Sequence, residues 1–311
     1  MLFSATATTV GAVACSHGWD SYDPRLGTAS ASGSGGGAAQ SSTAVGTASS
    51  TTSASSTTSS TTSAASSSAT SGAGGAEAGP PTYRDIILAD GPLAYWRFGD
   101  AQGPTIVDEV GQHPGTASAK GLTYGVPGVL AGNTAMSFNG STGSIGVPGG
   151  WDFAGNSPYS FELWAKLGLP TNDYPRIISQ EENNNPRQGY LLLAGVAPDG
   201  GSPFFGTERW RDNQNILAAF YHGPVSGTEW THVVARFDGA VGAIFINGAL
   251  AQTDSSGSDA GIVATAKAFT IGVASNQGSH FTGSLDEVAV YGKALSDVVI
   301  ASHYNAGIAG L

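Results

Sequence analysis

The sequence predicts an all-β domain, folded as a two-sheet antiparallel sandwich or jelly roll, with one short C-terminal helix and a disordered linker before it. From Pro80 onward, short runs of β-branched and aromatic residues alternate with clusters of Gly, Pro, Asn and Asp, as in strands joined by turns. Helical spacing is confined to the last segment. No repeat of about 40 residues is visible, which disfavours a propeller.

Strands are expected wherever apolar residues alternate or cluster between turn signals. The clearest alternation places Phe161, Leu163 and Ala165 on one face of a strand, with Glu162 and Trp164 on the other. The expected strands are Leu93–Phe98, Ala135–Phe138, Ser144–Val147, Tyr159–Lys166, Arg176–Gln180, Tyr190–Ala194, Ile216–His222, Thr231–Phe237, Ala240–Ile246, Phe269–Val273 and Ser284–Tyr291.

Two tight turns predict a meander near the middle of the domain. Asn247-Gly248 is the preferred pair for a type I′ hairpin, because both central residues need a positive φ. Phe237-Asp238-Gly239 marks a second turn just before it. Together they predict a meander from Trp230 to Ala251.

Only the C-terminal tail is expected to be helical. Ser296 can cap its start, and Val299 and His303 recur at helical spacing. Gly307 stands where a left-handed cap would end the helix.

Much of the unusual composition lies in one block, residues 28–79. Every residue there is Ala, Gly, Ser or Thr except Gln40, Val45 and Glu77. Such a segment cannot bury enough apolar surface to offset the entropy of ordering, so we expect a disordered linker. An O-glycosylated stalk is the alternative interpretation of this Ser/Thr-rich tract.

The first 15 residues resemble a bacterial lipoprotein signal. Met1 to Ala14 is uncharged and apolar, and Ala12-Val13-Ala14 leads directly into Cys15. The resemblance implies lipidation of Cys15, followed by a short polar segment over residues 16–27, and export to the bacterial cell envelope with a lipid anchor in the membrane. Secretion without an anchor, or a mobile apolar N-terminus with an incidental thiol, is the alternative. No other segment approaches the ~20 apolar residues of a membrane helix.

Charge and cysteine content exclude several classes of function. Lys and Arg total 12 against 23 Asp and Glu, a net charge of −11. This balance argues against nucleic-acid binding, which needs clustered cations. A single cysteine excludes an internal disulfide framework and a cysteine-based zinc site.

Several short segments carry a family resemblance. In chain order they are Ala94-Tyr95-Trp96-Arg97-Phe98-Gly99-Asp100, Ala135-Met136-Ser137-Phe138-Asn139-Gly140, Tyr159-Ser160-Phe161-Glu162-Leu163-Trp164, Trp230-Thr231-His232-Val233-Val234, Ile244-Phe245-Ile246-Asn247-Gly248 and Phe281-Thr282-Gly283-Ser284-Leu285-Asp286-Glu287-Val288-Ala289-Val290-Tyr291. By order and spacing they resemble the LamG-like jelly roll of the concanavalin A-like lectin/glucanase superfamily. The resemblance runs from about Pro92 to Gly307. This fold hosts lectins, glycosidases and adhesion modules, so function has to be argued from sites.

The chain is not expected to be an enzyme. Glucanases of the resembled superfamily place their carboxylates two strand residues apart, as in Glu-x-Asp-x-x-Glu, and this sequence contains no such run. Glu162 stands alone on its strand. Asp286 and Glu287 are adjacent and are therefore expected to face opposite sides of the sheet. A glycoside hydrolase or lyase whose carboxylates converge from different strands is the alternative.

The resemblance also implies a structural calcium ion between an early segment and the final strand. Calcium takes oxygen ligands from carboxylates, amides and carbonyls. Asp286 is the first candidate ligand, with Asp100 and Asn139 as partners and Asp108 as an alternative. The other interpretation of Asp286 and Glu287 is structural, with one carboxylate exposed and the other held by backbone N–H groups.

Ligand-binding residues are expected in the longest loops, which are Gly168–Pro175, Glu181–Gly189 and Gly195–Asn215. Sugars stack on aromatic rings and pair their hydroxyls with amides and charged groups. The candidates are Trp210, Tyr174, Arg209 and Asn184. The alternative is that Trp210 packs its loop onto the sandwich.

The expected function is therefore non-catalytic recognition of a glycan or an extracellular protein at the cell surface, by a domain of residues 80–311 on a flexible tether. A structural envelope or adhesion module without a small ligand is a further alternative to the hydrolase. The sequence gives no indication of an oligomeric state.

Overall fold

A computed structural model describes residues 80–168, 174–196, 203–256 and 261–311. The predictions for the leader, for Cys15, for the polar segment and for the linker over residues 28–79 lie outside the described residues. Neither helix of the described part is long and apolar enough to cross a membrane.

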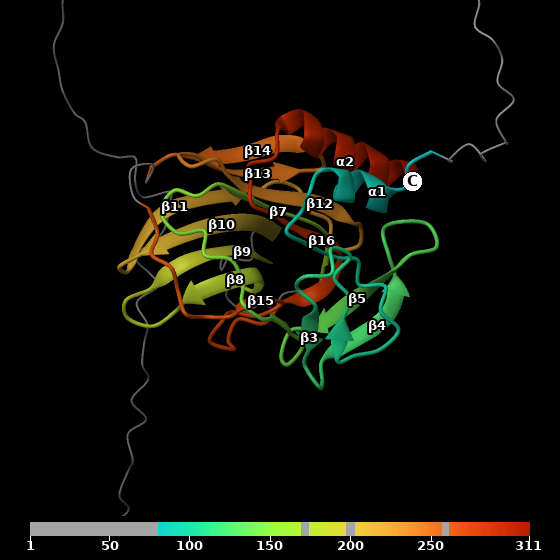
Figure 1. Cartoon of the computed structure of the whole chain (residues 1–311), viewed down its shortest axis with the longest axis horizontal. Coiled ribbons are helices and arrows are strands. Elements are labelled where there is room, and N and C mark those ends of the chain that lie inside the picture. Colours follow the sequence, from blue (N-terminus) through green and yellow to red (C-terminus); the bar gives the residue numbers. More distant parts are fainter. Residues whose placement is uncertain (1–79, 169–173, 197–202, 257–260) are drawn as a thin grey trace, which may run out of the picture. The chain divides into compact units, whose positions relative to one another are not determined.

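The domain consists of two antiparallel sheets of eight strands each, which confirms the predicted sandwich (Figure 1). Sheet A has the order β14-β13-β12-β7-β16-β5-β4, with β1 paired to β16. Its strands are β1 (Ala94–Trp96), β4 (Leu122–Pro127), β5 (Thr134–Asn139), β7 (Tyr159–Leu167), β12 (Thr231–Phe237), β13 (Gly242–Ile246), β14 (Ala249–Asp254) and β16 (Thr282–Tyr291). The predicted meander is confirmed as β12, β13 and β14.

Sheet B has the order β11-β10-β9-β8-β15-β6-β3-β2. Its strands are β2 (Thr105–Ile106), β3 (Gly115–Ala117), β6 (Ile145–Val147), β8 (Arg176–Glu182), β9 (Gln188–Val196), β10 (Pro203–Arg211), β11 (Gln214–Tyr221) and β15 (Phe269–Ile271). The main core lies between the two sheets. Phe161, Leu163 and Ala165 of β7 point into it, as the alternation predicted, while Trp164 belongs to a second cluster on the outer face of sheet A.

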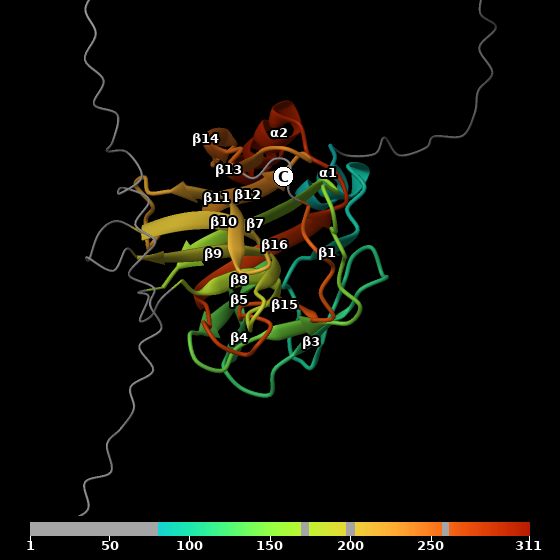
Figure 2. The ribbon, with the colours of Figure 1, turned by 90° about the vertical axis from the view of Figure 1, so that its left-hand side faces the viewer.

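That second cluster exists because two helices cover the outer face of sheet A (Figure 2). They are α1 (Tyr83–Ala89) and α2 (Asp297–Ala309). Helix α1 is held by a capping box between Thr82 and Asp85, and the Tyr83 amide donates to the carbonyl of Leu311. The expectation of a single helix was wrong, because α1 has only seven residues, too few for a periodic pattern.

The predicted start of the C-terminal helix is confirmed, and its predicted end is wrong. The Ser296 hydroxyl accepts from the Val299 amide as an N-cap. The helix continues through Gly307 to Ala309, and the left-handed cap is Gly310, with φ of 69°. Gly307 is instead a packing residue: a Cβ there would lie 2.4 Å from Cζ2 of Trp164.

The expected loop over 195–215 was also wrong in its centre, where β10 forms. The strand alternates strictly, with Phe205 and Arg209 directed inward and Phe204, Glu208 and Trp210 directed outward. Its charged residues suggested a loop, yet each of them is paired or stacked in the fold. Strands β2, β3, β4 and β14 were not expected individually, because they are short, edge-located or rich in exposed residues.

Candidate functional site

The outer face of sheet B differs from that of sheet A, because neither described helix covers it. Four neighbouring strands present three rows of side chains there, set by the strand register. The rows are Arg176, Leu193, Gly206 and Phe220; then Ser179, Leu191, Glu208 and Ala218; then Glu181, Gly189, Trp210 and Asn215. This face therefore has a polar part, made of ion pairs, and an apolar part, made of aliphatic and aromatic side chains.

The apolar part is a small cluster of its own. Leu191, Leu193 and Phe204 are buried, and Tyr174, Trp210 and Phe220 pack around them while staying partly exposed. Tyr174 lies 5.6 Å from Phe204 between ring centroids, and Phe220 lies 5.8 Å from the same ring. Gly206 makes room for this packing, since a Cβ at that position would lie 2.5 Å from the Phe220 ring.

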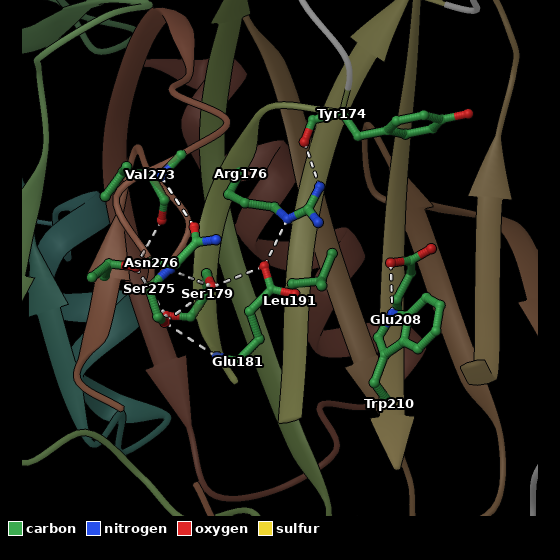
Figure 3. Close-up of polar contacts among 12 residues, drawn as sticks. Tyr174, Arg176, Ser179, Glu181, Leu191, Glu208, Trp210, Val273, Ser275 and Asn276 are labelled. Carbon is green, nitrogen blue, oxygen red and sulfur yellow. Dashed lines mark hydrogen bonds and ion pairs between the residues drawn. The ribbon is translucent and has the colours of Figure 1, made fainter. Parts of the chain in front are cut away.

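The polar part is a row of buried ion pairs, of which Figure 3 shows the one between Arg176 and Glu181. Glu181 accepts from Nε of Arg176 at 2.8 Å and from Nη2 of Arg187 at 2.9 Å. The same Arg187 nitrogen lies 3.3 Å from Glu208. Burial alone would raise the pKa of Glu181, but the two guanidinium groups hold it below its ordinary value. The two carboxyl groups and the two guanidinium groups thus form one connected network.

Trp210 links the two parts. Its indole Nε1 donates to Glu208 at 2.9 Å (Figure 3), and the Arg187 guanidinium lies over its ring at 3.7 Å from the centroid. The ring is thus fixed in orientation by a carboxylate at its edge and a cation on one face. Such a ring is pre-ordered for stacking, because little side-chain entropy remains to be lost on binding.

The sequence-predicted ligand residues are only partly brought together. Trp210 and Tyr174 lie on this face and pack against one cluster. Arg209 does not: it is buried in the sandwich, 3.7 Å from the Phe237 ring, and donates to the carbonyl of Gly155. It was placed beside Trp210 because a loop was expected, whereas neighbours on a strand face opposite sides.

Asn184 is exposed in the turn between β8 and β9. Tyr174 precedes β8 and Asn184 follows it, so about 20 Å of strand separates them. One sugar ring cannot contact both. Phe220 and Leu191 were not predicted as site residues. The alternation of residues 203–211 is the signal that was missed: it predicts a strand, β10, whose outward side chains share one face with Leu191 of β9 and Phe220 of β11.

The two adjacent acids of β16 do not have the orientation that the sequence predicted. Asp286 and Glu287 do not face opposite sides: the Asn133 Nδ2 donates to both, at 3.3 and 2.7 Å. A register shift between Asp286 and Ala289, with a φ of 52° at Glu287, turns the second side chain toward the first. Both are fully buried, and burial raises the pKa of each. The expectation that one of them is exposed was wrong.

The other predicted calcium ligands are each engaged by backbone N–H groups. Asp100 accepts from the Val107 amide, and Asn139 closes its own turn by accepting three backbone N–H groups. Asp108 is buried and accepts from the amides of Tyr95, Val110, Gln112 and His113. Among the described residues, no group of three or more His, Cys, Asp or Glu side chains is arranged to hold a metal.

Glu162, the carboxylate considered for hydrolysis, lies on the outer face of sheet A beneath α2. It accepts from His232 at 2.8 Å, from His303 at 2.9 Å and from Tyr291 at 3.0 Å. Burial alone would raise its pKa, but the two histidines lower it to about 2. Its surroundings explain it as a structural carboxylate.

Comparison with known proteins supports the architecture. Domain 4 of AbnA, a GH43 extracellular arabinanase from Geobacillus stearothermophilus solved in complex with arabinotriose, is similar with a TM-score of 0.52 and 19% identity. The match covers 68% of this chain and 98% of that domain.

Two toxin domains are similar as well. The botulinum neurotoxin serotype G binding domain matches with a TM-score of 0.53 and 12% identity over 68% of this chain. The binding domain of Paraclostridial Mosquitocidal Protein 1 matches with a TM-score of 0.51 and 15% identity over 70%. The chain spans about half the length of these toxin domains, 50% and 52%. At such identities the likeness shows the fold.

No curated protein sequence matches the chain. A family model described as the concanavalin A-like lectin/glucanases superfamily matches residues 139–301, just over half of the sequence. The matched segment begins at the end of β5 and includes β7, β8 to β13 and the β16 strand with its two acids. The chain therefore belongs to the concanavalin A-like lectin/glucanase superfamily.

Proposed function

We propose that this domain is a non-catalytic recognition module that binds glycan on the outer face of sheet B. The observation that carries the proposal is the set of three partly exposed aromatic rings, Tyr174, Trp210 and Phe220, on one sheet face that no described helix covers. Two of the similar structures are binding domains, and the arabinanase domain was solved in complex with arabinotriose. These likenesses support a binding role.

The chemistry of the face favours a neutral glycan. Aromatic rings stack on the apolar C–H faces of sugars, and a fixed indole does so at low entropic cost. Arg176 and Arg187 are engaged by Glu181 and Glu208, so neither guanidinium is free to take a sulfate or carboxylate group. The four charged side chains described on this face are paired with one another, which suits a neutral oligosaccharide.

The same contacts support a non-catalytic role. A retaining glycosidase needs one carboxyl group with a raised pKa as acid and a second as nucleophile. Glu181 and Glu208 share one guanidinium, and the pKa of Glu181 is lowered. Glu162 is fully buried beneath α2. A reducing-sugar assay on β-glucans and arabinan should therefore detect no turnover.

We also propose Cys15 as the lipid anchor of an exported protein. Incorporation of a palmitate analogue, lost on Cys15→Ser, is the expected result, and labelling that persists in the variant would contradict it.

The binding test compares two tryptophans in matched settings. Trp210 carries Arg187 over its ring, and Trp230, which packs against the sheet A cluster, carries Lys166 over its ring at 5.1 Å. A glycan array followed by calorimetry with arabinotriose should identify a neutral ligand. Trp210→Ala should weaken its binding at least about tenfold, and Trp230→Ala should leave it unchanged.

Equal losses in both variants would place the ligand elsewhere. Binding only to sulfated or uronic glycans would contradict the neutral class while leaving a glycan-binding role. No binding to any glycan would favour a protein ligand or the structural-module alternative.

A further inference from the structure

The acid pair of β16 accepts hydrogen bonds from four residues in two segments of the chain, residues 95–97 and 129–133. Glu287 receives Nε and Nη2 of Arg97 at 3.1 and 3.0 Å, the Asn133 amide, and the hydroxyl of Tyr95. Asp286 receives the Val129 amide at 2.8 Å and the Asn133 amide at 3.3 Å. Each of the four carboxylate oxygens thus accepts at least one N–H or O–H.

Calcium requires a different set of groups. It binds six to eight oxygen atoms at about 2.3–2.6 Å, through lone pairs that point at the ion. Here the lone pairs point at N–H and O–H donors, which place positive hydrogens where a cation would sit. Asp100 and Asn139 are also engaged by backbone N–H groups at other places.

The two acids themselves are fully buried. The backbone of Gly128 lies directly over Asp286, so that a Cβ at Gly128 would lie 2.6 Å from its Oδ2. Arg97 covers the other side, with its own side chain only about a quarter exposed, at 28%. The residues that the family resemblance offers for calcium therefore do not fit the ion in this chain.

We infer that Arg97 is the built-in cation of this site: its guanidinium supplies the positive charge that a calcium ion would otherwise bring to Asp286 and Glu287. The domain is then a calcium-independent member of its superfamily. The Arg97 side chain, 190 residues away from Glu287 in sequence, bonds it directly next to the β1–β16 pairing.

The decisive measurement is thermal unfolding of the full chain in millimolar EDTA and in millimolar CaCl₂, together with calorimetric titration of Ca²⁺. We expect the same Tm in both solutions and no binding heat. If the site bound calcium, a free Ca²⁺ concentration of about 100 times the Kd would raise the Tm by several degrees. The two outcomes are therefore well separated. A calcium-dependent Tm in the wild type would overturn the inference.

A variant tests the role of Arg97 itself. Arg97→Met keeps most of the volume and removes the charge, so we expect a lower Tm that, unlike that of the wild type, rises on addition of Ca²⁺. The matched control is Arg84→Met, which removes a more exposed guanidinium paired with Glu109 at 2.6 Å. That variant should lose little stability and gain no response to calcium.

A folded Arg97→Met protein that shows no calcium response would mean that the acids need no cation, and would refute the assignment. Should Arg97→Met fail to fold, the wild-type comparison of EDTA with CaCl₂ still decides whether the site is metal-free.

Discussion

Two strands of this domain carry the same short pattern, a Glu and a Trp two residues apart, and the fold treats them in opposite ways. On β7, Glu162 and Trp164 point out of sheet A and are sealed under α1 and α2, at 0% and 2% exposure. On β10, Glu208 and Trp210 point out of sheet B, where no described helix lies over them and Trp210 stays partly exposed. Whether a helix covers the strand therefore decides whether its Glu and Trp side chains are buried in the core or stay at the protein surface.

The two faces also neutralise their carboxylates by different means. Glu162 is held by His232 and His303, and His303 reaches a second carboxylate, Asp90, through its other ring nitrogen at 3.0 Å. Both of its ring nitrogens meet carboxylate oxygens, an arrangement that favours the doubly protonated, charged form of His303. On sheet B the partners of Glu181 and Glu208 are arginines, which do not titrate in the physiological range. The covered face therefore contains a histidine partner whose pKa is raised, whereas the carboxylates of the open face are paired with arginines.

The largest expected effect is the loss of the carboxylate on the covered face. Glu162→Ala leaves two histidines and Tyr291 without their shared acceptor and should lower the free energy of unfolding by about 3–5 kcal/mol. Glu208→Ala should cost only about 1–3 kcal/mol, because Arg187 keeps Glu181 as its partner. Urea unfolding of both variants measures the difference. Equal losses of unfolding free energy in the two variants would contradict the proposed difference between the two faces.

The next effect is the response of stability to pH. The folded pKa of Glu162, about 2, lies below its ordinary value of 4.5, so its contribution is complete above pH 4.5 and is lost as the pH falls toward 2, about 3 kcal/mol in all. For His303, burial alone would lower the pKa, but Glu162 and Asp90 raise it above 6.5. Its contribution is complete below pH 6.5 and is lost as the pH rises through the raised pKa.

Urea midpoints measured across this range should thus decline at both ends, and His303→Gln should remove most of the alkaline decline. Ligand binding on sheet B should stay constant between about pH 5 and 8. If the ligand-binding constant changed with pH in parallel with the urea midpoint, the two sheet faces would be coupled.

The smallest effect tests the contact that seals the covered face. Gly307→Ala improves helix propensity by about 1 kcal/mol, yet its Cβ would meet Trp164 at 2.4 Å. We expect a net loss of about 1–3 kcal/mol from overpacking in urea unfolding. Gly227→Ala, with its nearest neighbour 3.4 Å away, is the spatially unstrained control. A Gly307→Ala protein more stable than the wild type would mean that α2 can move off the sheet.

Much of the fold could be predicted because it depends on local patterns. The alternation of residues 159–166, the turn at Asn247-Gly248 and the cap at Ser296 are all confirmed, since each is set by neighbours in the chain. The site could be predicted less well. Trp210 and Tyr174, chosen by residue type, lie on one sheet face, whereas Arg209 lies in the core because a strand formed where a loop was expected.

The sequence by itself determined the all-β class, the period of the strands and the family, because alternation and turn chemistry need only a few adjacent residues. Tertiary structure alone decided which Glu-x-Trp strand is covered, why Gly307 must be glycine, and that Asp286 and Glu287 face the same way. The physical reason is that these outcomes depend on contacts across more than a hundred residues. Arg97 and Asn133 can hold the bulge at Glu287 only once β16 lies beside them.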